Sequence, residues 1–190
     1  IITGIYGQDG SILAEKLHKK NYEIYGIRNL VNSEQSKKNR KILKNKKVNI
    51  KEIKVDILNY DKLKKNILKI KPELIFHLSA YHSSSEERIL SGETIIYKNI
   101  TPVVNILDIL KNNLKKTKFI NAGSCLMFDN CSNTPQTEKN KWESSSPYGI
   151  SKIITANLVK YYRENYNMFT VTPILYNHES SRRSDKFVSQ

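Results

Sequence analysis

The sequence is poor in cysteine, in acidic residues and in long apolar runs. Cys125 and Cys131 are too few for a disulfide framework, and no Cys/His spacing suits zinc, so we expect no bound metal. No run approaches the roughly 20 apolar residues of a membrane span, and the first residues lack the order of a signal peptide. These features argue against membrane proteins and secreted disulfide scaffolds. We expect a protein of the reducing cytoplasm with no membrane partner.

Basic residues outnumber acidic ones by 32 to 18, which gives a formal net charge of +14. The densest basic run, residues 37–47, contains lysines but no interleaved aromatic residues. Surfaces that read nucleic-acid bases favour arginine over lysine. We therefore interpret the run as a solvated helix face or loop and predict no nucleic-acid partner.

Short apolar runs alternate with longer segments that carry an apolar stripe. The runs predict strands near 1–3, 23–28, 50–55, 73–78, 117–121 and 169–175. The striped segments predict helices near 10–20, 35–45, 59–70, 93–114 and 148–166. Pro102 is expected near a helix start, where a missing N–H does no harm. This alternation predicts an α/β protein with a Rossmann-like, doubly wound parallel sheet formed by residues 1–190, with ligands at the carboxyl ends of the strands.

Three glycines follow the first predicted strand directly. Gly4 suits a tight turn, Gly7 allows a pyrophosphate to approach the backbone, and Gly10 allows close helix packing. The amides of the following helix N-terminus would face the phosphates. Because the glycines lie at a strand-to-helix junction, they predict a dinucleotide site that includes Gln8 and Asp9.

The second predicted strand ends in Arg28, where a site that prefers NAD usually has an acidic residue. Arginine pairs well with a phosphate group. Arg28 therefore favours NADP as the cofactor, with NAD as the alternative. An exposed arginine with only a surface role is the other interpretation.

Tyr148 and Lys152 are four residues apart, so on a helix they share one face. The lysine charge is then expected to lower the pKa of the phenol towards the working pH. Spacing alone decides little, because Tyr60 and Lys64 form a second such pair. Only Tyr148 has a serine, Ser124, placed just past the end of a predicted strand.

These residues resemble the extended short-chain dehydrogenase/reductase family. The resemblance implies that Ser124, Tyr148 and Lys152 are a catalytic triad. The tyrosinate would take a proton from a sugar hydroxyl while hydride passes to the nicotinamide, and the serine would hydrogen-bond the same oxygen. The resemblance also implies further cofactor contacts, from Asp56, Leu78, Ala80 and Tyr81.

Residues 3–10, 146–149 and 175–183 look more specifically like the GDP-mannose 4,6-dehydratase family, whose members are lyases. The last segment implies that His178 and Arg183 contact the cofactor and that Asn177, with Ser124, contacts the substrate. The resemblance implies a GDP-sugar substrate, GDP-mannose or a relative, and a homo-oligomer. It also implies that the chain matches the N-terminal half of such an enzyme and that the C-terminal substrate domain is absent from it.

Two positions depart from the family pattern. Leu126 stands where the family has the glutamate that removes the C5 proton, and leucine cannot act as a base. Glu179 or Glu138 could replace that base. Residues 28–32 replace paired arginines and a serine-rich loop, which weakens the implication of NADP and of a tetramer. The alternatives are therefore a GDP-sugar 4-dehydrogenase, epimerase or 4-keto-reductase without dehydration, or a catalytically silent cofactor-binding scaffold.

Overall fold

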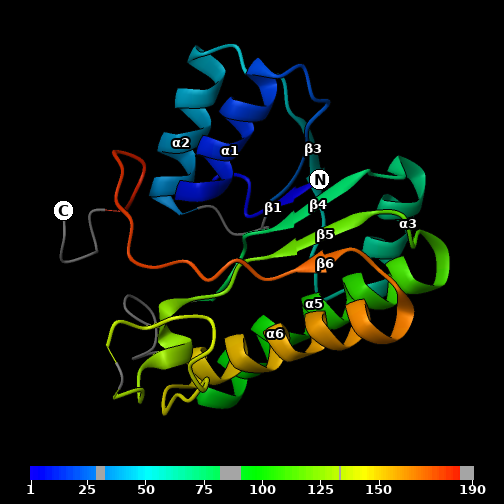
Figure 1. Ribbon diagram of the computed structural model, residues 1–190. Coiled ribbons are helices and arrows are strands. Elements are labelled where there is room, and N and C mark those ends of the chain that lie inside the picture. Colours follow the sequence, from blue (N-terminus) through cyan, green and yellow to red (C-terminus); the bar gives the residue numbers. More distant parts are fainter. Residues whose placement is uncertain (29–32, 82–90, 133, 185–190) are drawn as a thin grey trace.

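Six parallel strands form one sheet in the computed structural model, which describes residues 1–28, 33–81, 91–132 and 134–184. The strands are β1 (Ile2–Thr3), β2 (Tyr25–Arg28), β3 (Lys51–Lys54), β4 (Leu74–His77), β5 (Lys118–Asn121) and β6 (Thr170–Val171). Their order is β3-β2-β1-β4-β5-β6, so the chain runs out to one edge, returns to the middle and continues to the other edge (Figure 1). This is the order of a doubly wound dinucleotide-binding sheet. The predicted fold class is confirmed.

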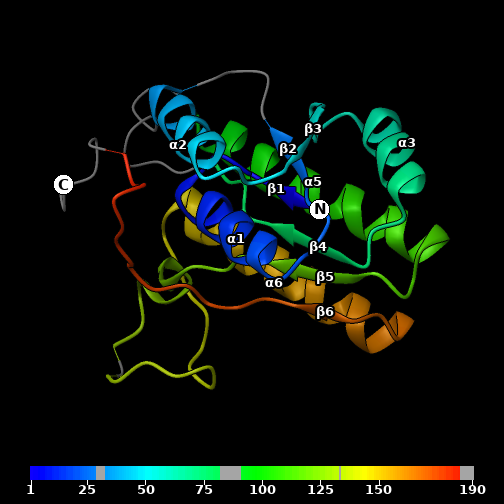
Figure 2. The ribbon, with the colours of Figure 1, turned by 90° about the horizontal axis from the view of Figure 1, so that it is seen from above.

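Helices cover both faces of the sheet (Figures 1 and 2). One face carries α1 (Gln8–Lys19) and α2 (Glu34–Asn45), and the other carries α3 (Tyr60–Ile70), α5 (Gly92–Asn113) and α6 (Pro147–Tyr166). Each layer encloses its own apolar core, around Ile5, Ala14 and Leu43 on the first face and around Leu63, Ile106 and Phe119 on the second. Each helix end lies within two residues of its predicted position.

The last strand is shorter than the sequence predicts. We expected a strand near 169–175, whereas β6 ends at Val171. Pro173 has no N–H to donate to a ladder. From Pro173 on, isolated hydrogen bonds join the chain to the segment that follows β5. Gly123 N donates to Pro173 O at 2.8 Å, and Cys125 N donates to Leu175 O at 2.9 Å.

Two other features differ from expectation. The short 3-10 helix η1 (Cys125–Phe128) was not predicted. Pro102 lies inside α5 rather than near its start, because Ser91 caps that helix eleven residues earlier and its buried face continues through the proline.

The lysine-rich run lies on α2 as far as Asn45 and then in the turn that follows, as predicted. That helix buries Asn39 and Leu43, while the lysine side chains of 37–47 are exposed. No helix in the described part of the chain is both long enough and apolar enough to span a membrane.

Candidate active site

The glycine loop lies between β1 and α1, at the middle of the sheet. Gly4 has a φ of +67°, which L side chains rarely adopt, so this turn requires glycine. A Cβ on Gly10 would lie 2.3 Å from the Gly4 carbonyl oxygen. A Cβ on Gly7 would meet only that oxygen, at 3.2 Å. A side chain on Gly7 would therefore be crowded by backbone on one side, whereas Gly7 itself is exposed, as the approach of a pyrophosphate requires.

The N-terminus of α1 lacks a side-chain cap. The other four described α-helices begin after a residue whose side chain accepts a hydrogen bond from a first-turn amide, namely Ser33, Asn59, Ser91 and Ser146. Gly7 holds this position for α1 and makes no such bond. The first-turn amides and the positive end of the helix dipole are thus available to an anion. With the glycine cradle, they fit the diphosphate of NAD(P).

A buried hydroxyl joins the ends of β1 and β4. Thr3 Oγ1 accepts hydrogen bonds from the amides of Leu78 and Ser79, both at 3.2 Å, and lies 2.9 Å from His77 Nδ1. Burial, together with the Lys152 charge, lowers the pKa of His77 to about 3, so the ring is neutral. The network fixes the start of the segment that contains Leu78 and the exposed Ala80.

Asn99 of α5 holds Tyr81. The Tyr81 amide donates to Asn99 Oδ1 at 2.8 Å, and Asn99 Nδ2 donates to the Tyr81 carbonyl at 3.0 Å. Sequence reasoning missed this residue. The available signal was a polar side chain within the buried stripe that also contains Ile95 and Val103.

Ser124, Tyr148 and Lys152 come together in the fold, and all three are buried. Ser124 follows β5 and caps η1, whereas Tyr148 and Lys152 lie on the first turns of α6. A hydrogen bond joins the side chains of Ser124 and Tyr148. Lys152 Nζ donates to the Ala122 carbonyl at 2.8 Å and lies 5.5 Å from the centre of the Tyr148 ring.

The expected lowering of the Tyr148 pKa is wrong. Burial raises the pKa of Tyr148 to about 12, although the Ser124 hydrogen bond acts in the opposite direction. Burial also lowers the pKa of Lys152 to about 8. The loss of solvent around both groups outweighs any benefit from the lysine charge. Tyr148 is therefore a neutral phenol at pH 7, able to donate a proton.

The segment 176–183 runs past the carboxyl ends of the strands to α1 (Figure 1, orange to red). His178 Nε2 lies 2.7 Å from Asp9 Oδ1, and the His178 carbonyl accepts bonds from Gln8 and Arg183, both at 2.9 Å. The hydrogen bond to the Tyr176 backbone and the bond to Asp9 raise the pKa of His178. The structure thus brings four predicted cofactor contacts together.

Arg182 fixes the same segment to α1 and α2. Its buried side chain forms an ion pair with Glu15 of α1. Its carbonyl accepts bonds from Asn39 and Gln35 of α2, both at 3.1 Å. Sequence reasoning missed Arg182, for which the doubled arginine at 182–183 is the only signal.

Arg28 is the last residue of β2, and its Nε lies 3.3 Å from Glu52 Oε2 on β3. The side chain is 13% exposed, so the interpretation as an exposed surface arginine is wrong. The rest of the departure from the family pattern, residues 29–32, lies outside the described residues.

Two predicted contacts make no bond to these clusters among the interactions described above. Asp56 follows β3 in an exposed turn, where its Oδ1 accepts a bond from the Leu58 amide at 3.0 Å. Asn177 is exposed in the segment 176–183.

Leu126, at the position of the expected elimination base, lies two residues after Ser124. The Leu126 amide donates to Ser124 Oγ at 3.2 Å. Of the two carboxylates considered as replacements, Glu138 is exposed and Glu179 lies 3.0 Å from Arg183.

Comparison with known proteins places this fold and site in one family. A family model described as GDP-mannose 4,6 dehydratase matches residues 1–190. GDP-mannose 4,6 dehydratase from Cricetulus griseus is 33% identical over 196 residues, a match that takes in 100% of this chain and 52% of the relative. The protein of the same name from Homo sapiens matches to the same extent. The chain thus spans about half the length of the curated relatives it matches.

Solved structures share the fold. UDP-glucose 4-epimerase from Brucella ovis, in complex with NAD, has a TM-score of 0.75 at 22% identity, over 93% of this chain and 51% of that one. UDP-glucuronic acid 4-epimerase from Bacillus cereus, in complex with UDP-glucuronic acid and NAD, has a TM-score of 0.74 at 25% identity, over 92% and 54%. The first likeness shows the fold alone. The match of the family model along the whole sequence confirms the resemblance seen in segments 3–10, 146–149 and 175–183, and the chain belongs to the GDP-mannose 4,6-dehydratase family.

Proposed function

We propose that this chain is the NADP(H)-binding and redox part of a nucleotide-sugar enzyme that oxidises a GDP-hexose, GDP-mannose or a relative, at C4. The observation that carries this proposal is the buried cluster of Ser124, Tyr148 and Lys152 beside the glycine loop. Residues 1–190 would form the cofactor domain, and a further domain would complete the sugar-nucleotide pocket.

Bound NADP(H) supplies the hydride acceptor or donor. In the oxidation direction Tyr148 first loses its phenol proton to solvent, and the phenolate then accepts the proton of the C4 hydroxyl, while Ser124 hydrogen-bonds the same sugar oxygen. Lys152, fixed by the Ala122 carbonyl, keeps a positive charge beside the Tyr148 ring. This charge favours the phenolate that forms when Tyr148 gives up its proton.

A second candidate is redox chemistry without loss of water, as in a 4-dehydrogenase, an epimerase or a 4-keto-reductase. Two observations favour it. Leu126 offers no base where the family has glutamate, and the raised pKa of Tyr148 suits a proton donor, which reduction of a ketone requires. A silent cofactor-binding scaffold is less well supported, because such a role would not need the Ser124, Tyr148 and Lys152 cluster.

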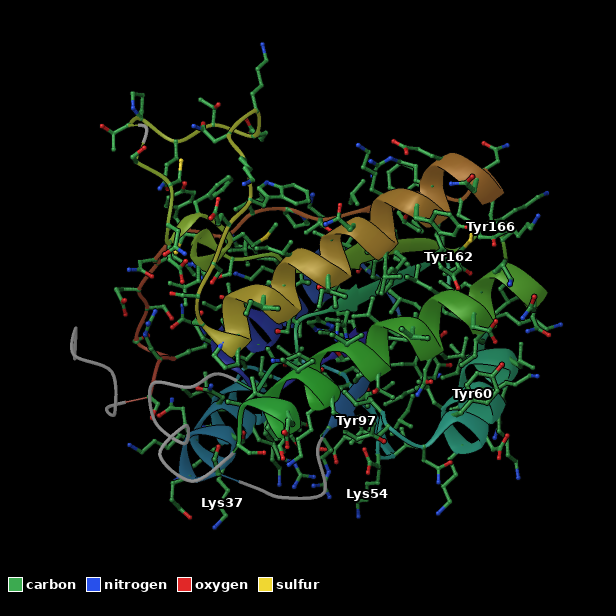
Figure 3. All side chains as sticks on the ribbon, turned by 90° about the horizontal axis from the view of Figure 1, so that it is seen from below. Lys37, Lys54, Tyr60, Tyr97, Tyr162 and Tyr166 are labelled. Carbon is green, nitrogen blue, oxygen red and sulfur yellow. The ribbon has the colours of Figure 1, made fainter. Side chains whose placement is uncertain are left out.

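We also propose that the protein is a homo-oligomer of the reducing cytoplasm. Apolar side chains seven residues apart are exposed on both outer helices, Tyr97 and Val104 on α5 and Ile154 and Tyr161 on α6. Positions seven apart share one helix face. Figure 3 views the outer side of α5 and α6, which lie side by side. Cys125 and Cys131 are both free thiols, which suits a reducing compartment.

The test is to incubate the full-length protein with GDP-mannose and NADP and to read the mass of the sugar product. Loss of one water supports a dehydratase and requires a base other than residue 126. Nicotinamide reduction without loss of water supports the second candidate. An unchanged sugar and cofactor, despite bound NADP, contradicts the proposal for this substrate.

A further inference from the structure

A cluster of charged side chains lies at the end of β2, away from the catalytic residues. Glu52 of β3 is its centre: Oε2 lies 3.3 Å from Arg28 Nε, and Oε1 lies 2.7 Å from an Nη of Arg40 on α2. The Tyr6 hydroxyl also donates a hydrogen bond to Glu52. One carboxylate thus joins a strand, a helix and the glycine loop.

This carboxylate is charged. Burial alone would raise the pKa of Glu52, but the Tyr6 hydrogen bond and the charges of Arg40 and Arg28 outweigh burial and lower it. Glu52 is 21% exposed and Arg28 13% exposed, so solvent screens this pair only partly. The negative charge of Glu52 therefore offsets about one of the two positive charges that Arg28 and Arg40 bring to this cluster.

The position of the cluster relates it to the cofactor. In doubly wound folds the end of the second strand lies against the adenosine ribose, where an acid binds the 2′-hydroxyl of NAD or an arginine accommodates the 2′-phosphate of NADP. Arg28 ends that strand, and Tyr6 belongs to the loop that would hold the diphosphate. This chain presents both kinds of group at the same place, the arginines from β2 and α2 and the acid from β3.

We propose that Glu52 sets the choice between NADP and NAD, by offsetting the charge of Arg28 and Arg40 so that the 2′-phosphate gains little and NAD is accepted beside NADP. The inference rests on the proposed function, since it requires that the chain bind a nicotinamide dinucleotide. Glu52 acts here as a specificity residue and takes no part in hydride transfer.

The test measures the dissociation constants of NADP and NAD by calorimetry, with the full-length protein and its variants. Glu52→Gln keeps the shape of the side chain and removes its charge. We expect it to raise the preference for NADP by about fivefold, with less effect at high salt. Arg40→Gln should lower the preference for NADP. Glu23→Gln, which removes a carboxylate paired with Lys51, is the matched control and should leave the ratio unchanged.

A probe without nicotinamide isolates the effect. 2′,5′-ADP should gain affinity in Glu52→Gln, whereas 5′-AMP should not. An unchanged or lowered NADP preference in Glu52→Gln, in a protein that still binds both cofactors, overturns the inference alone. Failure of the wild-type protein to bind either cofactor overturns the proposed function. If Glu52→Gln does not fold, the NADP preference of Arg40→Gln becomes the test of the inference. A preference equal to that of the wild-type protein then overturns it.

Discussion

The phenol oxygen of Tyr148 is the proton-transfer group of the proposed reaction. Tyr148→Phe should lower turnover by about 10²- to 10⁴-fold. Binding of NADP should persist, because the glycine loop and the segment 176–183 are untouched. The measurement compares nicotinamide absorbance during turnover with calorimetric binding of NADP.

Tyr60→Phe is the matched control for this change. Tyr60 also has a lysine four residues later, but its hydroxyl donates to Asp108 of α5 at 2.6 Å and not to a serine. Turnover should be unchanged in this variant. Wild-type turnover in Tyr148→Phe would contradict the assignment of proton transfer to Tyr148.

Leu126 is the residue that decides between elimination and simple redox chemistry. Leu126→Glu introduces a carboxylate at the residue whose amide donates to Ser124 Oγ, and we expect this carboxylate to take up a proton made acidic by a C4 ketone. We expect the fraction of product that has lost water to rise by about tenfold or more. Mass spectrometry of the sugar nucleotide measures this fraction, and Leu126→Gln is the uncharged control. Equal water loss in both variants contradicts the idea that a missing base limits the reaction.

His77 should make the fold sensitive to acid. Its pKa falls from 6.5 to about 3 on burial, so between these values the unfolded chain binds a proton that the folded chain does not. Stability is therefore lost as the pH falls below 6.5, by at most about 5 kcal/mol. His77→Gln should flatten this loss. Urea unfolding of the wild-type protein and of His77→Gln between pH 6.5 and 5.5, above the range in which carboxylates titrate, tests this. Equal slopes of stability against pH in the two proteins contradict the prediction.

At the scale of elements, the glycine loop separates folding from binding. A Cβ on Gly10 would clash with backbone, so Gly10→Ala should destabilise the fold by about 1–3 kcal/mol. Gly7 has a φ of −68°, which alanine adopts readily, and an added Cβ would meet only the Gly4 carbonyl oxygen, at 3.2 Å, so Gly7→Ala should destabilise the fold less than Gly10→Ala does. Binding of NADP should nevertheless weaken by about tenfold, because the added methyl group occupies the approach of the diphosphate. Urea unfolding and calorimetry measure the two effects. Equal loss of stability in the two variants, or tight NADP binding in Gly7→Ala, would contradict this division.

The elements themselves were largely predictable, because a parallel sheet buried on both faces needs apolar runs and its crossover helices need apolar stripes. The sequence predicts too long a strand for β6, because most residues from Thr170 to Leu175 are typical of strands. The ladder nevertheless ends early, since Pro173 has no backbone N–H to donate. The 3-10 helix η1 was not predicted, because four residues are too few to show a helical period of apolar side chains.

At the scale of the whole molecule, the sequence predicts the site residues that lie in local motifs. It does not predict residues that only the fold brings together. The glycine loop, Tyr148 with Lys152, and His178 lie in short recognisable segments. Glu52, by contrast, reaches Tyr6 and Arg28 from distant parts of the sequence and carries no motif. The raised pKa of Tyr148 was likewise missed, since burial depends on the packed helix and not on the spacing to Lys152.

The exposed stripes on α5 and α6 predict self-association. Two copies that bring these helices together would bury the apolar side chains around Val104 and Ile154, and a stable interface needs roughly 800 Å² from each partner. Val104→Glu combined with Ile154→Glu should place like charges in that contact and weaken association by at least about tenfold. Sedimentation of the full-length protein over a range of concentrations measures this. Tyr22→Glu, which alters an exposed aromatic residue next to α1, is the control. A monomeric wild-type protein, or a double variant that associates as tightly as the control, would contradict an interface on these helices.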